Sequence, residues 1–269
     1  MNTLGFIGAG NMATAILGGV LSKGKFSKEE VIISAKTDST ISKVEYKFGV
    51  KVTKDNKEVV KKSDIIILAV KPNIYDNVLE EVKEYIDTKK IIIAIAAGKT
   101  IKNIEDIIGS DKKIIRIMPN TPALIGEGMT SITPNKNIQE GELKEIEELL
   151  NSFGKSQIIE ESLIDAVIGV SGSSPAYTYM YIEALADGAV LHGMKREQAY
   201  KFAAEAVIGA AKMLLETGAH PGELKDMVCS PSGTTIEAVK VLEEEGFRKA
   251  VIKAEDACIK KSKEMSSSK

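Results

Sequence analysis

The sequence has few of the residues on which metal sites and histidine-based active sites depend. Its 269 residues include two cysteines, two histidines and no tryptophan. Two cysteines cannot build a disulfide framework, and Cys229 and Cys258 are too far apart for a Cys-x-x-Cys pair. His192 and His220 form no zinc-ligand spacing with them, and their positions at a predicted helix end and before a proline indicate structural roles. We therefore expect no metal, and either a reaction that needs no strong acid or base from the protein or no reaction.

An excess of charge of either sign is also missing. The chain has 36 basic and 38 acidic residues and a net charge of −2. Residues 1–160 hold 23 basic and 22 acidic side chains, a net charge of +1, and residues 161–269 hold 13 and 16, a net charge of −3. This balance disfavours a nucleic-acid-binding surface. No apolar run reaches the ~18 residues of a membrane span, and the first residues lack a basic segment, so we expect no membrane segment, no signal peptide and a cytoplasmic protein.

Two patterns divide the chain near residue 160. Before it, short β-branched runs alternate with amphipathic stretches, which predicts a parallel sheet covered by helices on both faces. After it, alanine-rich helices follow, and we expect a second subunit to complete their packing. Strands are predicted at 4–7, 31–34, 50–52, 65–69, 91–96 and 114–118, with two more at 129–133 and 156–159. Helices are predicted at 12–22, 39–48, 56–62, 73–86, 101–108 and 140–153, then at 163–171, 175–192, 196–216, 221–228, 234–245 and 247–266.

A glycine-rich turn follows the first predicted strand. Its sequence, Gly8-Ala9-Gly10-Asn11-Met12-Ala13, has the form G-x-G-x-x-A between a strand and a helix. Gly8 permits the tight turn, Gly10 lets a pyrophosphate approach the backbone, and Ala13 lets the helix pack close to the strand. The free N–H groups of the helix N-terminus favour a phosphate. This context predicts dinucleotide binding; the alternative is a turn without a ligand.

The end of the second predicted strand indicates which dinucleotide binds. An NAD site usually has an acidic residue there, on the ribose 2′-hydroxyl. This chain has Ser34, Lys36 and Thr37, and no acid before Asp38. These side chains could hold a 2′-phosphate, so we predict that NADP(H) is preferred and that NAD(H) can also be used. The alternative is that Lys36 is only a solvated loop residue.

Three further strand ends belong to the same expected crevice, because ligands of parallel sheets bind outside the carboxyl ends of the strands. Small and polar residues follow each of these strands. Turn formation alone would also explain them. The residues are Ala69, Val70, Lys71 and Pro72 after the fourth strand, Ala97 and Gly98 after the fifth, and Asn120 after the sixth.

A hydroxyl-rich loop interrupts the helical part. Ser230, Ser232, Gly233, Thr234 and Thr235 lie just before or at the start of a predicted helix. One hydroxyl would suffice to cap the helix, and several hydroxyls at a helix N-terminus favour an anion. We interpret the loop as a cradle for a substrate carboxylate, with plain capping as the alternative.

Six segments together resemble pyrroline-5-carboxylate reductases. The similarity extends from Gly5 to about Phe247, and six motifs in the same order across both parts of the chain are very specific. The segments are Gly8-Ala9-Gly10-Asn11-Met12-Ala13, Ala69-Val70-Lys71-Pro72, Met118-Pro119-Asn120-Thr121-Pro122, Ser171-Gly172-Ser173-Ser174-Pro175-Ala176-Tyr177, His220-Pro221-Gly222-Glu223-Leu224-Lys225-Asp226 and Ser230-Pro231-Ser232-Gly233-Thr234-Thr235.

The resemblance implies an α/β chain with an N-terminal Rossmann-type dinucleotide-binding domain (1–160) and an all-α C-terminal substrate-binding and dimerisation domain (161–269). It implies hydride transfer from NAD(P)H to the imine carbon of 1-pyrroline-5-carboxylate, giving L-proline. It also implies a homodimer, often assembled further into rings such as a decamer. By motif, residues 8–13 would hold the pyrophosphate, and Ser34 and Lys36 would contact the adenosine ribose. Asn56 and residues 69–72 would line the cofactor, and Ala97, Gly98 and Asn120 would lie toward the nicotinamide. Residues 230–235 would bind the substrate, with Thr235 facing its ring nitrogen.

The chain departs from the family pattern at two positions. Ser174 and Ser232 stand where the family commonly has glycine, and a serine at 232 would be unfavourable if that position needs a positive φ. Two other functions are considered. A β-hydroxyacid dehydrogenase would have a catalytic lysine on the long helix, and residues 164–194 contain no lysine. A non-catalytic NADP-sensing protein would not explain the hydroxyl-rich loop at 230–235.

Overall fold

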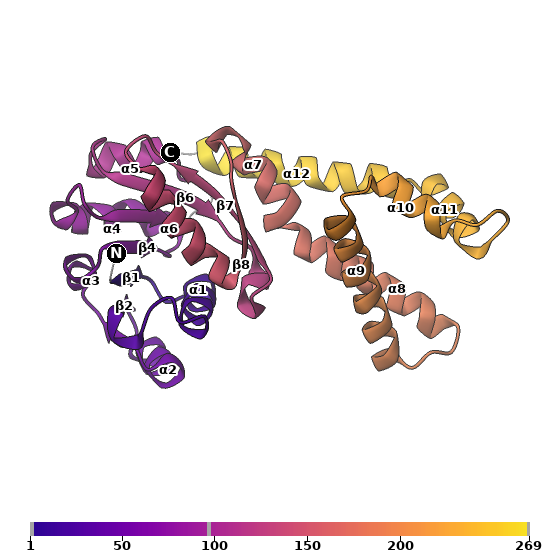
Figure 1. The fold of residues 1–269 in the computed structure, drawn as a ribbon, viewed down its shortest axis with the longest axis horizontal. Helices are drawn as coiled ribbons and strands as arrows, with labels where there is room; N and C mark the ends of the chain where they lie inside the picture. The colour runs from indigo at the N-terminus through magenta and orange to yellow at the C-terminus, as the bar shows by residue number, and fades with distance from the viewer. Residues whose placement is uncertain (1–2, 96–97, 268–269) are drawn as a thin grey trace. The chain divides into compact units, whose positions relative to one another are not determined.

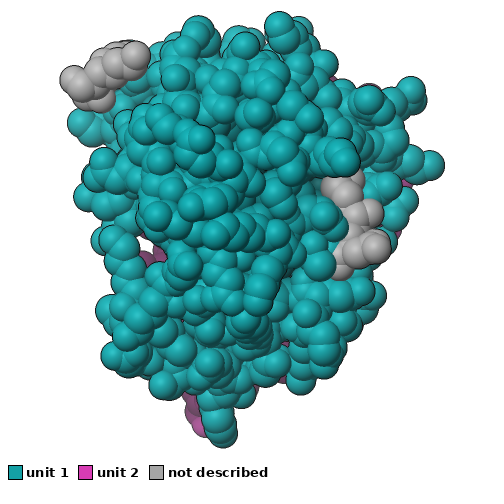
Figure 2. All heavy atoms as spheres, turned by 90° about the vertical axis from the view of Figure 1, so that its left-hand side faces the viewer, with its two compact units in different colours: residues 1–172, 258–269 teal, residues 173–257 magenta. Residues whose placement is uncertain are grey.

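The computed structural model describes residues 3–95 and 98–267. The chain separates into two compact units, coloured in Figure 2. The first comprises Met1–Gly172 and Cys258–Lys269, and the second comprises Ser173–Ala257. The last helix of the chain therefore begins in the second unit and ends in the first.

The first unit is built on one sheet of eight strands (Figure 1). Their order is β3-β2-β1-β4-β5-β6-β7-β8. Strands β1 to β6 pair in parallel, as predicted, whereas β7 pairs antiparallel with β6, and β8 pairs in parallel with β7. The sheet is thus mixed. The chain order of its strands reverses beside β1, since β2 and β3 lie on one side of β1 and β4 to β8 lie on the other. The strands are β1 Leu4–Ile7, β2 Val31–Ser34, β3 Lys51–Thr53, β4 Ile65–Leu68, β5 Ile91–Ala94, β6 Lys113–Met118, β7 Gly128–Pro134 and β8 Gly154–Ile158.

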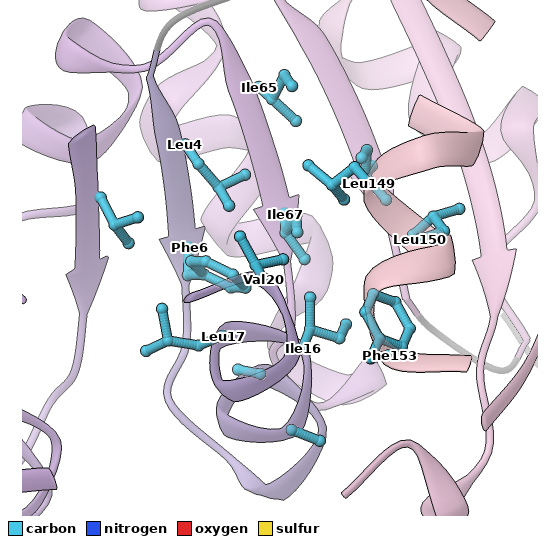
Figure 3. Packing of buried hydrophobic residues seen from close by; sticks show 14 of the residues in the cluster. Leu4, Phe6, Ile16, Leu17, Val20, Ile65, Ile67, Leu149, Leu150 and Phe153 are labelled. Carbon is cyan, nitrogen blue, oxygen red and sulfur yellow. The ribbon is translucent and has the colours of Figure 1, made fainter. Parts of the chain in front are cut away.

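Helices cover both faces of this sheet because its strands are apolar on both sides. In β1, Phe6 belongs to one buried cluster and Ile7 to the other, as the alternation of a strand requires. Figure 3 shows the first cluster, which includes Phe6 of β1, Ile16 and Phe153. Helices α1, α2 and α6 contribute to that cluster, and α3, α4 and α5 contribute to the other. The helices are α1 Asn11–Ser22, α2 Asp38–Phe48, α3 Asn56–Lys62, α4 Tyr75–Val82, α5 Ile101–Ile108 and α6 Glu140–Leu150.

Some stretches predicted as single helices are subdivided. The stretch 73–86 consists of a 3-10 turn, α4 and a second 3-10 turn, and 140–153 is α6 followed by a 3-10 turn. The stretch 163–171 contains α7 and a π-helical turn. The short elements are η1 Lys28–Glu30, η2 Pro72–Ile74, η3 Lys83–Tyr85, η4 Thr121–Ile125, η5 Asn151–Phe153, η6 Glu161–Leu163, α7 Ile164–Val167 and η7 Ile168–Gly172.

The second unit is helical throughout, as predicted. Its buried apolar residues are three alanines, Ala186, Ala199 and Ala203, whereas many large apolar side chains, such as Met180 and Phe202, are exposed. Apolar surface of this extent marks an interaction site. None of the described helices is both long enough and apolar enough to cross a membrane. The helices are α8 Ser174–Leu191, α9 Arg196–Thr217, α10 Pro221–Val228, α11 Thr234–Glu244 and α12 Phe247–Ser267.

Candidate functional site

The turn after β1 has the geometry that a bound phosphate requires. Gly8 has φ +99°, and a Cβ added there would lie 2.6 Å from the carbonyl oxygen of Ala69. A Cβ on Gly10 would meet no atom within 4 Å, so the space beside that backbone is open to a ligand. Only glycine satisfies the conditions at position 8, since L-residues rarely adopt this φ.

Helix α1 directs unpaired amides at the same open space. Its first backbone hydrogen bond joins the Thr14 N–H to the Gly10 carbonyl at 3.0 Å, so the N–H groups of Asn11, Met12 and Ala13 have no helical acceptor. The first turn contains no acidic residue. Ala13 is fully buried in the first apolar cluster, which agrees with its predicted packing role. The helix end therefore favours an anion, and these residues fit a pyrophosphate.

A cavity of about 480 Å³ lies at the carboxyl ends of β1, β2 and β4. This position is the place where the strand order reverses, at which doubly wound sheets bind their ligands. Of the predicted cofactor residues, Gly8, Ala9, Gly10, Ser34, Lys36, Asn56, Ala69, Val70 and Lys71 line it.

Three polar side chains that line this cavity form a hydrogen-bonded chain. The Ser34 hydroxyl donates to the Asn56 Oδ1 at 2.7 Å. The Asn56 Nδ2 donates to the Glu81 carboxylate at 2.9 Å. Glu81 also lines the cavity but was not predicted from the sequence. Because a carboxylate only accepts, it fixes which end of the Asn56 amide faces Ser34.

A second unpredicted residue, Lys54, lines the same cavity. Its Nζ lies 2.6 Å from an oxygen of Asp38, the acid that first follows β2. Lys36 is exposed and also lines the cavity. Thr37 caps α2, since its hydroxyl accepts from the Thr40 N–H at 3.3 Å.

Pro72, Gly98 and Asn120 are not among the residues that line this cavity. Pro72 and Gly98 line a separate cavity of about 580 Å³, together with Asp76 and Lys99. The Lys99 ammonium pairs with Asp76 at 2.7 Å. Ala97 lies outside the described residues.

Asn120 is held tightly within the first unit. Its side chain is 9% exposed, its Nδ2 donates to the Ser171 carbonyl at 3.0 Å, and its Oδ1 accepts from the Met129 N–H at 2.9 Å. Both ends of the amide thus tie together segments that are distant in the sequence. The predicted approach of Asn120 to the nicotinamide stays a prediction.

In the second unit, the hydroxyl-rich loop forms a tight turn before α11. The Gly233 N–H donates to the Ser230 carbonyl at 3.0 Å across Pro231 and Ser232. Ser232 has φ +57°, which together with a preceding proline is typical of a type II turn. The sequence departure at 232 therefore falls on a position that favours glycine.

Capping does not account for the hydroxyls of this loop. Gly233 is the N-cap of α11, and no side chain caps that helix. Within the described chain, the hydroxyls of Ser230, Ser232, Thr234 and Thr235 form no hydrogen bond. Because α11 begins at Thr234, its first N–H groups also lack helical acceptors. The turn and the helix end thus offer several donors to an anion.

The histidines have the structural roles that their positions indicated. His192 is the C-cap of α8. His220 is the N-cap of α10, where its Nδ1 accepts from the Gly222 N–H at 3.0 Å. Among the described residues, Cys229 and Cys258 form no disulfide. No group of three potential metal-binding side chains occurs among residues 3–95 and 98–267.

Comparison with known proteins extends these observations over the whole chain. The family model for pyrroline-5-carboxylate reductase dimerisation matches residues 161–265, and the model for NADP oxidoreductase, coenzyme F420-dependent, matches residues 3–98. Pyrroline-5-carboxylate reductase of Escherichia coli is 49% identical over 265 residues, which cover 98% of each chain.

Solved structures agree with this relationship. The reductase of Coxiella burnetii has a TM-score of 0.92 at 33% identity and covers 99% of both chains. The Plasmodium falciparum enzyme, whose crystal structure contains NADP, has a TM-score of 0.89 at 33% identity, covering 99% of this chain and 98% of the other. The fold, the glycine turn after β1 and these relatives therefore define a Rossmann-type NAD(P)H-dependent oxidoreductase. Within that class, the chain belongs to the pyrroline-5-carboxylate reductase family, as the six motifs predicted.

Proposed function

We propose that the protein reduces 1-pyrroline-5-carboxylate to L-proline with NADPH as the preferred donor. The observation that carries the proposal is that each unit has a helix N-terminus with unpaired donors: the open turn before α1, and the loop before α11 with its hydroxyls. A dinucleotide and a small carboxylate substrate together require two such sites. The family relationship supports both assignments.

The first unit would bind the cofactor along the carboxyl edge of its sheet. Residues 8–13 would hold the pyrophosphate, and Ser34, Lys36 and Asn56 would contact the adenosine ribose. When bound, the nicotinamide supplies a hydride to the imine carbon. Residues 69–72, Ala97, Gly98 and Asn120 would form the walls of the remaining part of the site.

The loop of the second unit would hold the substrate carboxylate. Ser230, Ser232, Gly233 and Thr234 would present backbone N–H groups and hydroxyls to its oxygens, in a turn that leads into the positive end of α11. Hydrogen bonds to a charged group contribute about 1.5–3 kcal/mol each. Orientation of the substrate would follow from this contact, which is a large part of what such a reaction needs.

Thr235 would hydrogen-bond the ring nitrogen of the substrate. A threonine hydroxyl is too weak an acid to donate a proton at neutral pH, so we assign it an orienting role. The proton would arrive on the substrate, because an imine is readily protonated, or through water. The scarcity of histidine and cysteine is consistent with this mechanism.

One assay tests the function and the role of Thr235 together. NADPH oxidation is followed at 340 nm with 1-pyrroline-5-carboxylate as substrate. A 3-hydroxy acid with NADP serves as the control for a dehydrogenase of the related layout. Thr235→Ala should lower kcat about tenfold to a hundredfold, the value of one hydrogen bond to a charged group, while Thr235→Ser retains most activity. Wild-type kinetics in Thr235→Ala with an unchanged circular dichroism spectrum would refute the assignment.

We further propose a cytoplasmic homodimer that contacts neither nucleic acid nor membrane and assembles into a ring, such as a decamer. The functional division would fall near residue 160, where the dimerisation model begins at residue 161. The exposed apolar side chains of the second unit support pairing through that part of the chain. Light scattering after size-exclusion chromatography measures the assembly, and a monomer would contradict this part of the proposal.

A further inference from the structure

We propose that Lys54 selects NADP(H) over NAD(H) by binding the 2′-phosphate, and that Asp38 limits this preference by competing for the same ammonium. The inference rests on the proposed cofactor use. Lys54 follows β3 and is separated by 17 residues from Lys36, the basic residue that the sequence itself indicated.

The sheet register brings these two lysines to the same edge. Strands β2 and β3 pair in parallel with Ser34 opposite Thr53. The Ala35 N–H then donates to the Thr53 carbonyl at 3.0 Å, so the two strands end together. Lys54 directly follows Thr53, Lys36 directly follows Ala35, and both lysines line the cavity.

Two neutral side chains that line the cavity, Ser34 and Asn56, do not discriminate in favour of a phosphate. Glu81 accepts from the Asn56 Nδ2, which leaves the Asn56 Oδ1 to accept the Ser34 hydroxyl hydrogen. The Ser34 oxygen therefore offers lone pairs to the cavity, and these suit a ribose hydroxyl, which can donate. A 2′-phosphate has acceptor oxygens and about −1.5 to −2 charge, so its recognition needs cations.

Asp38 holds Lys54 in a contact that a phosphate can replace. The Lys54 side chain is 58% exposed and the Asp38 side chain is 86% exposed, and the Lys54 Nζ lies 2.6 Å from the Asp38 Oδ1. Exposed ion pairs contribute little to stability, whereas charge-assisted hydrogen bonds to phosphate are stronger. Because Asp38 does not line the cavity, the Lys54 ammonium can leave Asp38 and turn toward a phosphate while the Asp38 side chain stays in place. The remaining carboxylate charge repels that phosphate, which lowers its net affinity.

A pair of ligands that differ only in the 2′-phosphate tests this inference without catalysis. Adenosine 2′,5′-bisphosphate and adenosine 5′-monophosphate are titrated calorimetrically against the intact protein and three variants. Lys54→Gln should lower the ratio of the two affinities about tenfold, and Asp38→Asn should raise it about threefold. Lys51→Gln is the matched control, since Lys51 is on β3, the strand that Lys54 follows, pairs with Glu58 at 2.5 Å and does not line the cavity.

The kinetic preference should follow the binding ratio. The quotient of kcat/KM for NADPH and NADH should fall in Lys54→Gln and rise in Asp38→Asn. Equal loss of both nucleotides in Lys54→Gln, or the wild-type ratio in both variants with unchanged thermal midpoints, would overturn the inference. If the binding ratios shift as expected but 1-pyrroline-5-carboxylate is not reduced, the proposed function fails and the inference stands.

Discussion

Replacing Ser232 with glycine should stabilise the protein, because the structure places this serine in a conformation that favours glycine. Ser232 has φ +57° and is the one non-glycine residue with positive φ among residues 3–95 and 98–267. It occupies the third position of the turn closed by the Gly233 N–H on the Ser230 carbonyl. A Cβ in this position crowds the following carbonyl.

The expected gain follows from two opposing effects. A left-handed backbone costs a non-glycine residue about 1–2 kcal/mol. Glycine offsets about 0.4–1 kcal/mol of this through the larger entropy that it gives the unfolded chain. The difference is about 0.5–1 kcal/mol in favour of Ser232→Gly. Because 1 kcal/mol shifts Tm by about 2–4 °C in a protein of this size class, we expect a rise of about 1–4 °C.

Differential scanning calorimetry of three proteins separates the backbone effect from the side-chain effect. Ser232→Ala removes the hydroxyl but keeps the Cβ, so it should not raise Tm. If Ser232→Ala stabilises as much as Ser232→Gly, the hydroxyl and not the backbone is the cause. An unchanged or lower Tm in Ser232→Gly would refute the reasoning. The KM for substrate adds an independent test, since a carboxylate contact by the Ser232 hydroxyl requires that both variants raise it.

Two further predictions concern the first unit. Gly8→Ala should weaken NADPH binding more than about tenfold in a fluorescence titration. The added Cβ would lie 2.6 Å from a backbone oxygen, and the residue would have to keep φ +99°. Gly141→Ala is the control and should bind NADPH normally, since a Cβ at Gly141 meets no atom within 4 Å. Glu161→Gln should lower stability to urea by about 1–3 kcal/mol, since it removes the charge that pairs at 2.9 Å with the Arg116 guanidinium, only 4% exposed, and keeps an acceptor for the Ile101 N–H. An unchanged urea midpoint would contradict that estimate.

The sequence was most informative where a buried element is strongly patterned. Helix α3 (Asn56–Lys62), helix α5 (Ile101–Ile108) and strand β1 (Leu4–Ile7) have the predicted bounds. The stretch 73–86 is less regular than predicted, because Pro72 begins a 3-10 turn before α4 and another such turn follows it. Local periodicity cannot distinguish these tighter turns from an α-helix, since both bury the same side of the chain.

The two cavity residues that the sequence analysis did not predict, Glu81 and Lys54, were missed for a different reason. Glu81 belongs to α4, and Lys54 follows the short strand β3, so no local motif marks either of them. They reach the cavity because β3 pairs with β2 and because Glu81 bonds to Asn56, and both are tertiary contacts. The sequence contained a weak signal, because a residue that directly follows a strand beside β2 must lie near the carboxyl edge of the sheet, where the cofactor is proposed to bind. Only the strand order identifies which strand that is.

The second unit explains why substrate binding should depend on assembly. Helix α11 carries the proposed carboxylate site at its first turn, yet no residue of α11 is buried in the single chain. The same holds for α10, which precedes the loop. A helix of about three turns is marginal in water unless an apolar face is covered, and α11 exposes Val241 and Leu242. A second copy that covers these faces would order the loop as well as join the chains. Folding of the substrate site and association would then be one equilibrium, so activity at high dilution should be lost together with the oligomer.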